Sequence, residues 1–282
     1  MSIFVSSACI RERNLKKNVL ELKRLGFRSV ELTGGLQFSG SNISEIKNIV
    51  EQSDVSLQLH NYSPPVEKDF VLNMASLNEK TFQRSLSHVQ SSLKLSEELN
   101  LGKYAVHAGF YIPIEADELG KVITKRVLYD RKESFERFVS TVTNLYSKGI
   151  GDLYIENNVV SKANFDEYGE NPFMLTCADE YFELKERIPQ LKILLDFAHL
   201  KVSCQSLGYS FEDEASRLVK ETDYVHVSDN DGLSDSNQGV SQDSEMYEIL
   251  KTSQLRGKTV TLEVYSGLED LKRTYDLIDQ LQ

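Results

Sequence analysis

Acidic and histidine residues recur at the ends of short apolar runs along this chain. Successive ends lie roughly 30 to 50 residues apart, which is the length of one strand, one crossover helix and two loops. In a parallel barrel the strands end on one face, so we expect these side chains to share a pocket. The residues at the ends of these runs are Glu31, His60, His107, Glu156, Asp196, His226 and Glu263.

The last four of these residues end consecutive runs and form the strongest chemical pattern. Three carboxylates and one imidazole that converge would repel one another unless they were protonated or bridged by a cation. Mixed oxygen and nitrogen ligands suit Mn²⁺, Zn²⁺, Co²⁺ or Mg²⁺. We therefore predict one divalent metal; the alternative is that each residue is a solvated strand end. The predicted ligands are Glu156, Asp196, His226 and Glu263.

Weaker candidates surround this set. In Asp196-Phe197-Ala198-His199 the histidine comes three residues after a predicted strand end, so it can turn back over the pocket. Asn157 directly follows Glu156, and Tyr62 comes shortly after the apolar run that ends at His60; we consider both for substrate contacts. Glu31 is a further candidate beside Gly34 and Gly35. Ordinary packing is the alternative for each of them.

The elements that would position these residues alternate between strand and helix. The apolar runs are rich in Val, Ile, Leu and Tyr with little alternation, as in a parallel sheet that is covered on both faces. We predict an α/β fold, a (β/α)8 TIM barrel that forms a single domain over residues 1–282. The expected strands are 3–7, 30–32, 55–60, 104–107, 153–156, 192–196, 224–226 and 259–263. The amphipathic segments expected to be helices are 14–27, 81–102, 134–149, 179–188, 212–221 and 268–281.

Segment 112–133 is the longest region between a predicted strand and its helix. It contains Lys121, Lys125 and Arg126. We expect a solvated charged helix here; the alternative is a lid that supplies cations to the pocket.

Composition narrows the class of protein. The net charge is −11, with 43 acidic against 32 basic residues, and no Lys/Arg cluster is present, so nucleic acid is a disfavoured partner. No apolar stretch is long enough to span a bilayer, and the N-terminal apolar section is too short for a secretory signal. The three cysteines show no paired spacing. These features predict a cytoplasmic protein without a membrane partner, and they leave a homo-oligomer open.

The segments LYIENN, LLDFAHL, VHVSDNDG and TLEVY resemble the xylose isomerase-like barrels. That group includes sugar isomerases and epimerases, inosose dehydratases and AP endonucleases of the endonuclease IV type, and the resemblance covers the whole chain in element order. It implies that Glu156, Asp196, His226 and Glu263 bind one metal ion. It also implies that the two glutamates transfer protons and that His199 contacts substrate.

In the nuclease members, two further histidines help to hold an additional metal, and His60 and His107 stand at the matching positions. A second metal is therefore compatible with the sequence. The chain departs from the nuclease pattern after the seventh strand, where Asp235 is present but Asn237 replaces an expected histidine. Asparagine is a poorer transition-metal ligand than imidazole.

We therefore expect an enzyme of carbohydrate metabolism, a metal-dependent isomerase or epimerase. It would act on a sugar or sugar derivative through an enediolate, whose charge a divalent metal neutralises. Glu156 and Glu263 would transfer the proton. The alternatives are an endonuclease IV-like phosphodiesterase, an inosose-type dehydratase, and a barrel that has lost catalysis.

Overall fold

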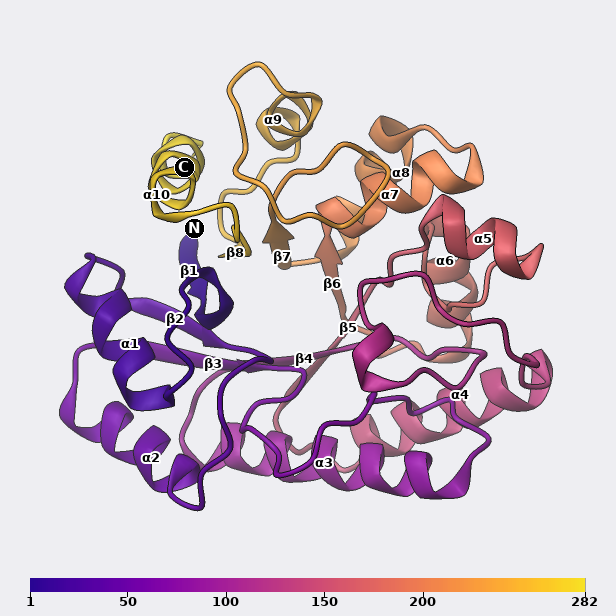
Figure 1. Cartoon of the computed structure of the whole chain (residues 1–282), viewed down its shortest axis with the longest axis horizontal. Coiled ribbons are helices and arrows are strands. Elements are labelled where there is room, and N and C mark those ends of the chain that lie inside the picture. Colours follow the sequence, from indigo (N-terminus) through magenta and orange to yellow (C-terminus); the bar gives the residue numbers. More distant parts are fainter. Residues whose placement is uncertain (282) are drawn as a thin grey trace.

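Eight parallel strands form a closed barrel in the computed structural model, which describes residues 1–281. The strands are β1 (Ser2–Ser6), β2 (Ser29–Leu32), β3 (Ser56–His60), β4 (Lys103–His107), β5 (Asp152–Glu156), β6 (Ile193–Asp196), β7 (Tyr224–Val227) and β8 (Thr259–Leu262). Each strand pairs with the next one along the chain, and β1 pairs with β8 to close the barrel (Figure 1). The predicted α/β class and (β/α)8 architecture are confirmed.

Helices surround the barrel. They are α1 (Leu15–Arg24), α2 (Asn42–Gln52), α3 (Glu79–Glu98), α4 (Arg131–Ser147), α5 (Lys162–Tyr168), α6 (Ala178–Arg187), α7 (Phe197–Leu207), α8 (Phe211–Leu218), α9 (Glu245–Thr252) and α10 (Leu268–Asp279). Helices α2, α5, α7 and α9 add to the predicted set. Because α5 and α9 have only seven and eight residues, they are too short to establish a helical period in the sequence. Within the described residues, no helix combines the length and apolar character needed to cross a bilayer.

Helix α1 illustrates how the sequence dictates these elements. The side chain of Asn14 accepts a hydrogen bond from the backbone N–H of Lys17 and so caps the first turn. Leu15, Val19 and Leu22 lie on one face and are buried against the barrel core. Gly26 follows with a φ of +103°, a conformation that favours glycine and lets the chain turn toward β2.

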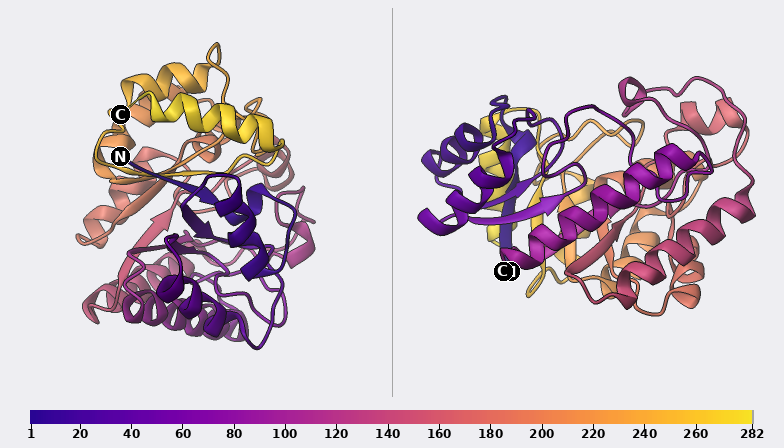
Figure 2. Two further views of the ribbon diagram at one scale, coloured as in Figure 1. Left: turned by 90° about the vertical axis from the view of Figure 1, so that its left-hand side faces the viewer. Right: turned by 90° about the horizontal axis from the view of Figure 1, so that it is seen from below.

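The strand register brings the predicted strand ends to one level. Asp196 pairs with His226 between β6 and β7, and His107 pairs with Glu156 between β4 and β5. Because the strands are parallel, these residues all lie at the carboxyl-terminal rim. Figure 2 shows the long helix α3, in purple, along one side of the barrel.

The segment between β4 and α4 differs from the prediction. It contains only a short 3-10 helix, η2 (Ala116–Glu118), and is otherwise irregular, so the expected solvated charged helix over 112–133 was wrong up to Asp130. Its apolar side chains Phe110, Ile112 and Ile123 join a cluster that is separate from the main core. That burial anchors the segment over the rim without helical hydrogen bonds.

Candidate metal centre

Four side chains from consecutive strand ends converge at the rim. Glu156 ends β5, Asp196 ends β6, His226 lies in β7 and Glu263 follows β8, and all four are buried. Nδ1 of His226 lies 3.6 Å from Oε1 of Glu156 and 3.6 Å from Oε2 of Glu263. The same nitrogen lies 3.8 Å from Oδ2 of Asp196. We call these residues the four-residue set.

The donor atoms of this set fit a divalent cation. Oε1 of Glu156, Oδ2 of Asp196 and Nδ1 of His226 are buried and have no hydrogen-bond partner. Burying unpaired polar atoms is costly unless a ligand satisfies them. Ligand atoms about 2.1 Å from a tetrahedral ion lie about 3.4 Å from one another, and Nδ1 of His226 lies close to this distance from a carboxylate oxygen of each of the other three residues. The structure therefore brings the four predicted ligands around His226, while the groups whose donor atoms all lie within 4.8 Å of one another are His60–Glu156–His226, His107–Glu156–His199 and Glu31–His226–Glu263.

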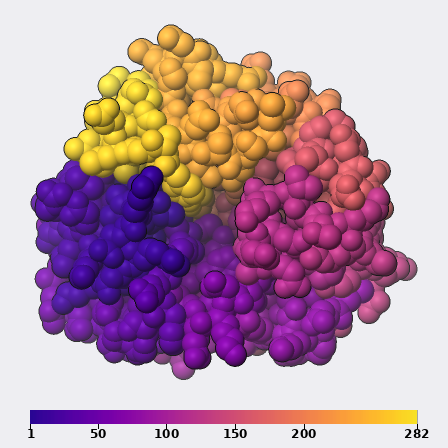
Figure 3. Space-filling view, viewed as in Figure 1, coloured from indigo at the N-terminus to yellow at the C-terminus, as the bar shows by residue number. Residues whose placement is uncertain are grey.

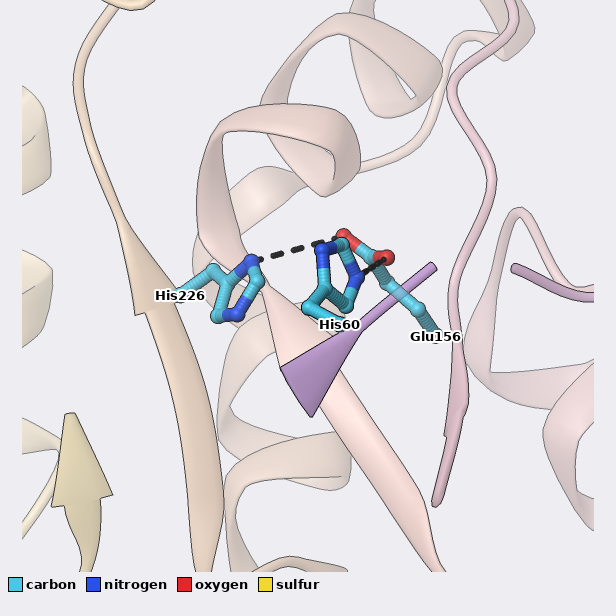
Figure 4. Close-up of side chains that lie close together, drawn as sticks. All are labelled: His60, Glu156 and His226. Carbon is cyan, nitrogen blue, oxygen red and sulfur yellow. Dashed lines mark hydrogen bonds and ion pairs between the residues drawn. The ribbon is translucent and has the colours of Figure 1, made fainter. Parts of the chain in front are cut away.

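A second group of donors meets the other oxygen of Glu156. Nε2 of His60 lies 2.7 Å from Oε2 of Glu156, and Nδ1 of His107 lies 3.4 Å from the same oxygen. Figure 4 shows the contacts of His60 and His226 with the two oxygens of the Glu156 carboxylate. Nδ1 of His60 is hydrogen-bonded to Oγ1 of Thr33 at 3.1 Å, which fixes the ring. Glu156 thus has one oxygen in each of two donor groups.

His199 lies in the first turn of α7, beside both groups. Its backbone N–H donates to Oδ1 of Asp196, which also caps the helix. Its Nδ1 donates to the carbonyl of Asn157 at 3.0 Å, and its Nε2 lies 3.2 Å from Oδ2 of Asp235. Nδ2 of Asn237 donates to that same oxygen at 3.3 Å. Asn237 therefore orients Asp235 in this structure.

Glu31 lies beneath His226 inside the barrel. Its Oε1 is 2.9 Å from Nε2 of His226, and it is fully buried. Its Oε2 accepts hydrogen bonds from Thr261 Oγ1 at 2.8 Å, from Gln58 Nε2 and from the Tyr224 hydroxyl. The two atoms do not have hydrogen-bond geometry, but the charge of a carboxylate at this distance favours a proton on Nε2, which would leave Nδ1 free to bind a metal.

Burial and neighbouring charges shift the pKa values of these groups in opposite directions. Burial lowers the pKa of His107 to about 4. Burial also acts to lower the pKa of His226, but the carboxylates of Glu31 and Glu263 outweigh it and raise that pKa well above the usual value. Burial, reinforced by the charge of Glu156, raises the pKa of Asp196 to about 7. Such opposed shifts mark a site of concentrated negative charge, where a cation is stabilised.

The three weaker substrate candidates occupy different places. Tyr62 lines a cavity that opens above the rim and is described below. Its hydroxyl accepts a hydrogen bond from the backbone N–H of Leu72 at 3.0 Å. Asn157 is buried, with Nδ2 donating to the carbonyl of Asp196 and Oδ1 accepting from its N–H. Asn157 and Glu31 do not line the cavity, and their contacts give them supporting positions beneath the candidate ligands.

The supporting residues Gln58, Tyr224 and Thr261 were not predicted from the sequence. Each stands two positions before a rim residue, namely His60, His226 or Glu263. Side chains two apart on a strand point to the same face, so a polar residue at this spacing within an apolar run lies directly below the rim. That spacing is the sequence signal that could have identified them.

A cavity of about 450 Å³ opens above the rim. We call it the rim cavity. His107, His199 and Asp235 lie at its polar end, and His107 and His199 lie 3.4 Å and 3.5 Å from the two carboxylate oxygens of Glu156. Its remaining lining comes mainly from the segment between β4 and α4, the residues that follow β5, and the loop after β7. In Figure 3 a hollow lies near the middle of the face, between the orange and magenta surfaces.

The fold and the converging donors define a TIM barrel with a candidate metal centre at its carboxyl-terminal rim. A family model described as a xylose isomerase-like TIM barrel matches residues 19–281, and the chain belongs to this family. The predicted family resemblance is thereby confirmed. No curated protein matches the chain significantly.

Solved structures share the fold at low sequence identity. A D-tagatose 3-epimerase-like protein has a TM-score of 0.73 and 16% identity, covering 100% of this chain and 97% of the other. D-Psicose 3-epimerase from Clostridium cellulolyticum has a TM-score of 0.64 and 15% identity, with 100% and 95% covered. Endonuclease IV from Thermus thermophilus has a TM-score of 0.62 and 14% identity, with 100% and 98% covered. At these identities the likeness shows the fold alone.

Proposed function

We propose that this protein is a divalent-metal-dependent isomerase or epimerase of a sugar or sugar derivative. The observation that carries the proposal is the four-residue set, which is buried, has unpaired donor atoms on Glu156, Asp196 and His226, and lies next to the His107 and His199 side chains that line the rim cavity. The fold likeness to a D-tagatose 3-epimerase-like protein and to D-psicose 3-epimerase supports carbohydrate chemistry.

Each member of the set has a role in this proposal. Glu156, Asp196, His226 and Glu263 would hold the ion. When bound, a divalent ion supplies positive charge that stabilises negative charge developing on substrate oxygens. Glu156 and Glu263 would remove and return the proton next to the substrate carbonyl. Glu263 is the more accessible of the pair, with 7% of its surface exposed against 0% for Glu156.

Three residues at the polar end of the rim cavity would orient the substrate. The His199 side chain is fixed through Nδ1 by the Asn157 carbonyl, so its Nε2 edge is turned toward Asp235 at the cavity. His107 keeps 27% of its side chain exposed, which makes it the most accessible of the rim histidines. We assign His199, Asp235 and His107 to contacts with substrate hydroxyl groups.

A second candidate function is favoured by one specific contact. Oε2 of Glu156 faces His60 and His107, so the site offers donors for two ions that share one carboxylate. Paired ions about 3.5 to 4 Å apart are typical of phosphoester hydrolysis. The second candidate is therefore a metal-dependent phosphodiesterase. Among the described residues that line the rim cavity, Lys121 is the only Lys or Arg, which does not favour a polynucleotide substrate.

Two measurements on the purified full chain test the leading proposal. Metal analysis should find bound divalent ion, and Mn²⁺ or Zn²⁺ should raise the melting temperature of chelator-treated protein. NMR should then detect deuterium entering a ketose or inosose from D₂O. Glu156→Gln should abolish this exchange, whereas the exposed helical variant Glu51→Gln should retain it. Absence of both metal binding and exchange would reject the proposal.

The second candidate has a separate readout. Cleavage of an abasic-site oligonucleotide or a simple phosphodiester, without deuterium exchange into any sugar, would replace the first proposal by the second. That cleavage should also be lost in Glu156→Gln, because both donor groups depend on this carboxylate. Two metal equivalents per chain would accompany it.

A further inference from the structure

The rim cavity has two chemically different sides. Its polar end holds His107, His199 and Asp235, next to the candidate metal ligands. Most of its remaining wall is apolar and includes Phe110, Ile114, Leu119, Val122, Phe173 and Leu233. A pocket that bound only the hydroxyl groups of a small sugar would need polar partners on every side, because unpaired buried hydroxyls are costly.

The deeper part of the apolar wall is preformed. Phe110 and Phe173 pack edge to face with ring centroids 5.6 Å apart, and Ile123 belongs to the same cluster. The cluster is separate from the main core, and it fixes the segment between β4 and α4 relative to the residues after β5. The wall therefore exists before any ligand binds.

The outer part of the wall exposes large apolar side chains to solvent. Leu119 is 42% exposed, Val122 is 61% exposed and Leu233 is 60% exposed. They come from two distant parts of the chain, yet all three line the same cavity. A single exposed aliphatic side chain is unremarkable in a folded protein, but three that meet at one cavity mark a binding surface.

The cavity offers few charges to a ligand. Lys121 is the only Lys or Arg among its described lining residues. The carboxylate of Glu118 is already paired with Arg126, with Nη1 at 2.7 Å and Nη2 at 3.0 Å. A densely charged ligand such as a sugar bisphosphate would find little compensation here.

We infer that the rim cavity binds a sugar derivative that carries an apolar substituent, such as a short alkyl, aryl or acyl group. The inference rests on the proposed function for the polar end, where the sugar oxygens would meet the candidate metal centre. The substituent lies against Phe110 and Phe173 and is covered at the mouth by Leu119, Val122 and Leu233. A volume of about 450 Å³ accommodates one such molecule and no polymer.

Alkyl glucosides test this inference directly. The probes are methyl, butyl and hexyl β-D-glucoside, titrated into the full chain by calorimetry or ligand-observed NMR, with and without added Mn²⁺. Burying each methylene strengthens binding several-fold, so butyl glucoside should bind about tenfold or more tightly than methyl glucoside. Hexyl glucoside should bind more tightly still.

Two valines of the same segment provide matched variants. Val122 lines the cavity, whereas Val127 is 88% exposed and does not line it. Val122→Asp should remove most of the gain in affinity with chain length, and Val127→Asp should preserve it. Leu233→Asp should behave like Val122→Asp, because it lies on the other loop of the same cavity. All three positions are exposed, so the variants should fold normally, as circular dichroism will show.

The outcomes separate this inference from the proposed function. Equal affinity for all three glucosides, no binding of any of them, or equal losses in the Val122 and Val127 variants would overturn the apolar subsite. If the chain binds no divalent ion and catalyses no exchange, the proposed reaction fails. A chain-length dependence that Val122→Asp abolishes would still stand in that case.

Discussion

Nε2 of His226 lies 2.9 Å from Oε1 of Glu31, and both side chains are completely buried. Glu31 reaches this position from β2, almost two hundred residues earlier in the chain, through the interior of the barrel. The contact turns Nδ1 of His226 toward the carboxylates of Glu156 and Glu263. Glu31 lies below the rim and thus helps to orient His226, one of the candidate metal ligands.

This relationship predicts a loss of metal affinity when Glu31 is removed. Glu31→Ala should weaken Zn²⁺ binding about 10- to 100-fold, because the His226 ring loses the partner that fixes its tautomer and orientation. Competition with a chromophoric chelator measures the affinity, and circular dichroism checks the fold. Glu31→Gln preserves the volume and an acceptor oxygen, so its loss should be smaller. Unchanged affinity in a folded Glu31→Ala protein would contradict this role.

The barrel and its rim were predictable because both depend on local sequence patterns. Apolar runs that end in Glu156, Asp196 or His226 identify parallel strands and their active face, and the structure brings those ends together. Their spacing could have placed Gln58, Tyr224 and Thr261 below the rim, but the contacts that these residues make with one another and with Glu31 were not predictable. Glu31, Gln58 and Tyr224 come from three strands, and which of them meet depends on barrel closure and stagger.

The apolar wall of the rim cavity was also missed, for a different reason. Segment 112–133 is rich in charges, which favoured a solvated helix, and its sparse apolar residues have no regular period. Ile112 and Ile123 are nevertheless buried, because they pack on Phe173 from beyond β5. The Arg126 side chain is paired with Glu118. Of the three cationic residues in this segment, Lys121, Lys125 and Arg126, only Lys121 lines the rim cavity.

Introducing an imidazole at position 237 should create a further metal site. Nε2 of His199 and Oδ2 of Asp235 lie 3.2 Å apart, and Nδ2 of Asn237 contacts the same oxygen. Asn237 has a φ of +47°, a conformation in which histidine is also found more often than most residues. Asn237→His should therefore bind one more Zn²⁺ equivalent than the wild type, measured by mass spectrometry of the metal content. Asn237→Gln is the control, and an unchanged zinc content in folded Asn237→His would count against this geometry.

Gly109, directly beyond β4, should not tolerate a side chain. A Cβ there would overlap Cβ of Ala75 and lie 2.9 Å from Sδ of Met174, and both neighbours are buried. Gly109→Ala should lower the free energy of unfolding by about 1–3 kcal/mol through overpacking. Urea denaturation measures the change. Gly40→Ala has no atom within 4 Å of the added methyl and should leave stability within about 0.5 kcal/mol, so equal effects of the two variants would disprove the packing argument.

His88 in α3 should make stability depend on pH. Burial lowers the pKa of His88, and the nearby charge of Arg84 acts in the same direction, although Nε2 donates to the Asn61 carbonyl at 2.9 Å. The unfolded chain therefore takes up a proton at a higher pH than the folded one. It follows that the stabilisation is complete above the ordinary value of about 6.5 and is lost as the pH falls below it.

The comparison of wild type with His88→Gln isolates this effect, since every other titrating group is common to both proteins. Glutamine can donate to the Asn61 carbonyl but does not titrate. The wild type should be the more stable protein at pH 8, and its advantage should shrink at pH 5, as followed by urea denaturation at several pH values. If the difference in stability between wild type and His88→Gln stayed constant across this pH range, His88 would have the same pKa in the folded and unfolded chain. That result would contradict its half-buried position between Tyr62 and Phe70.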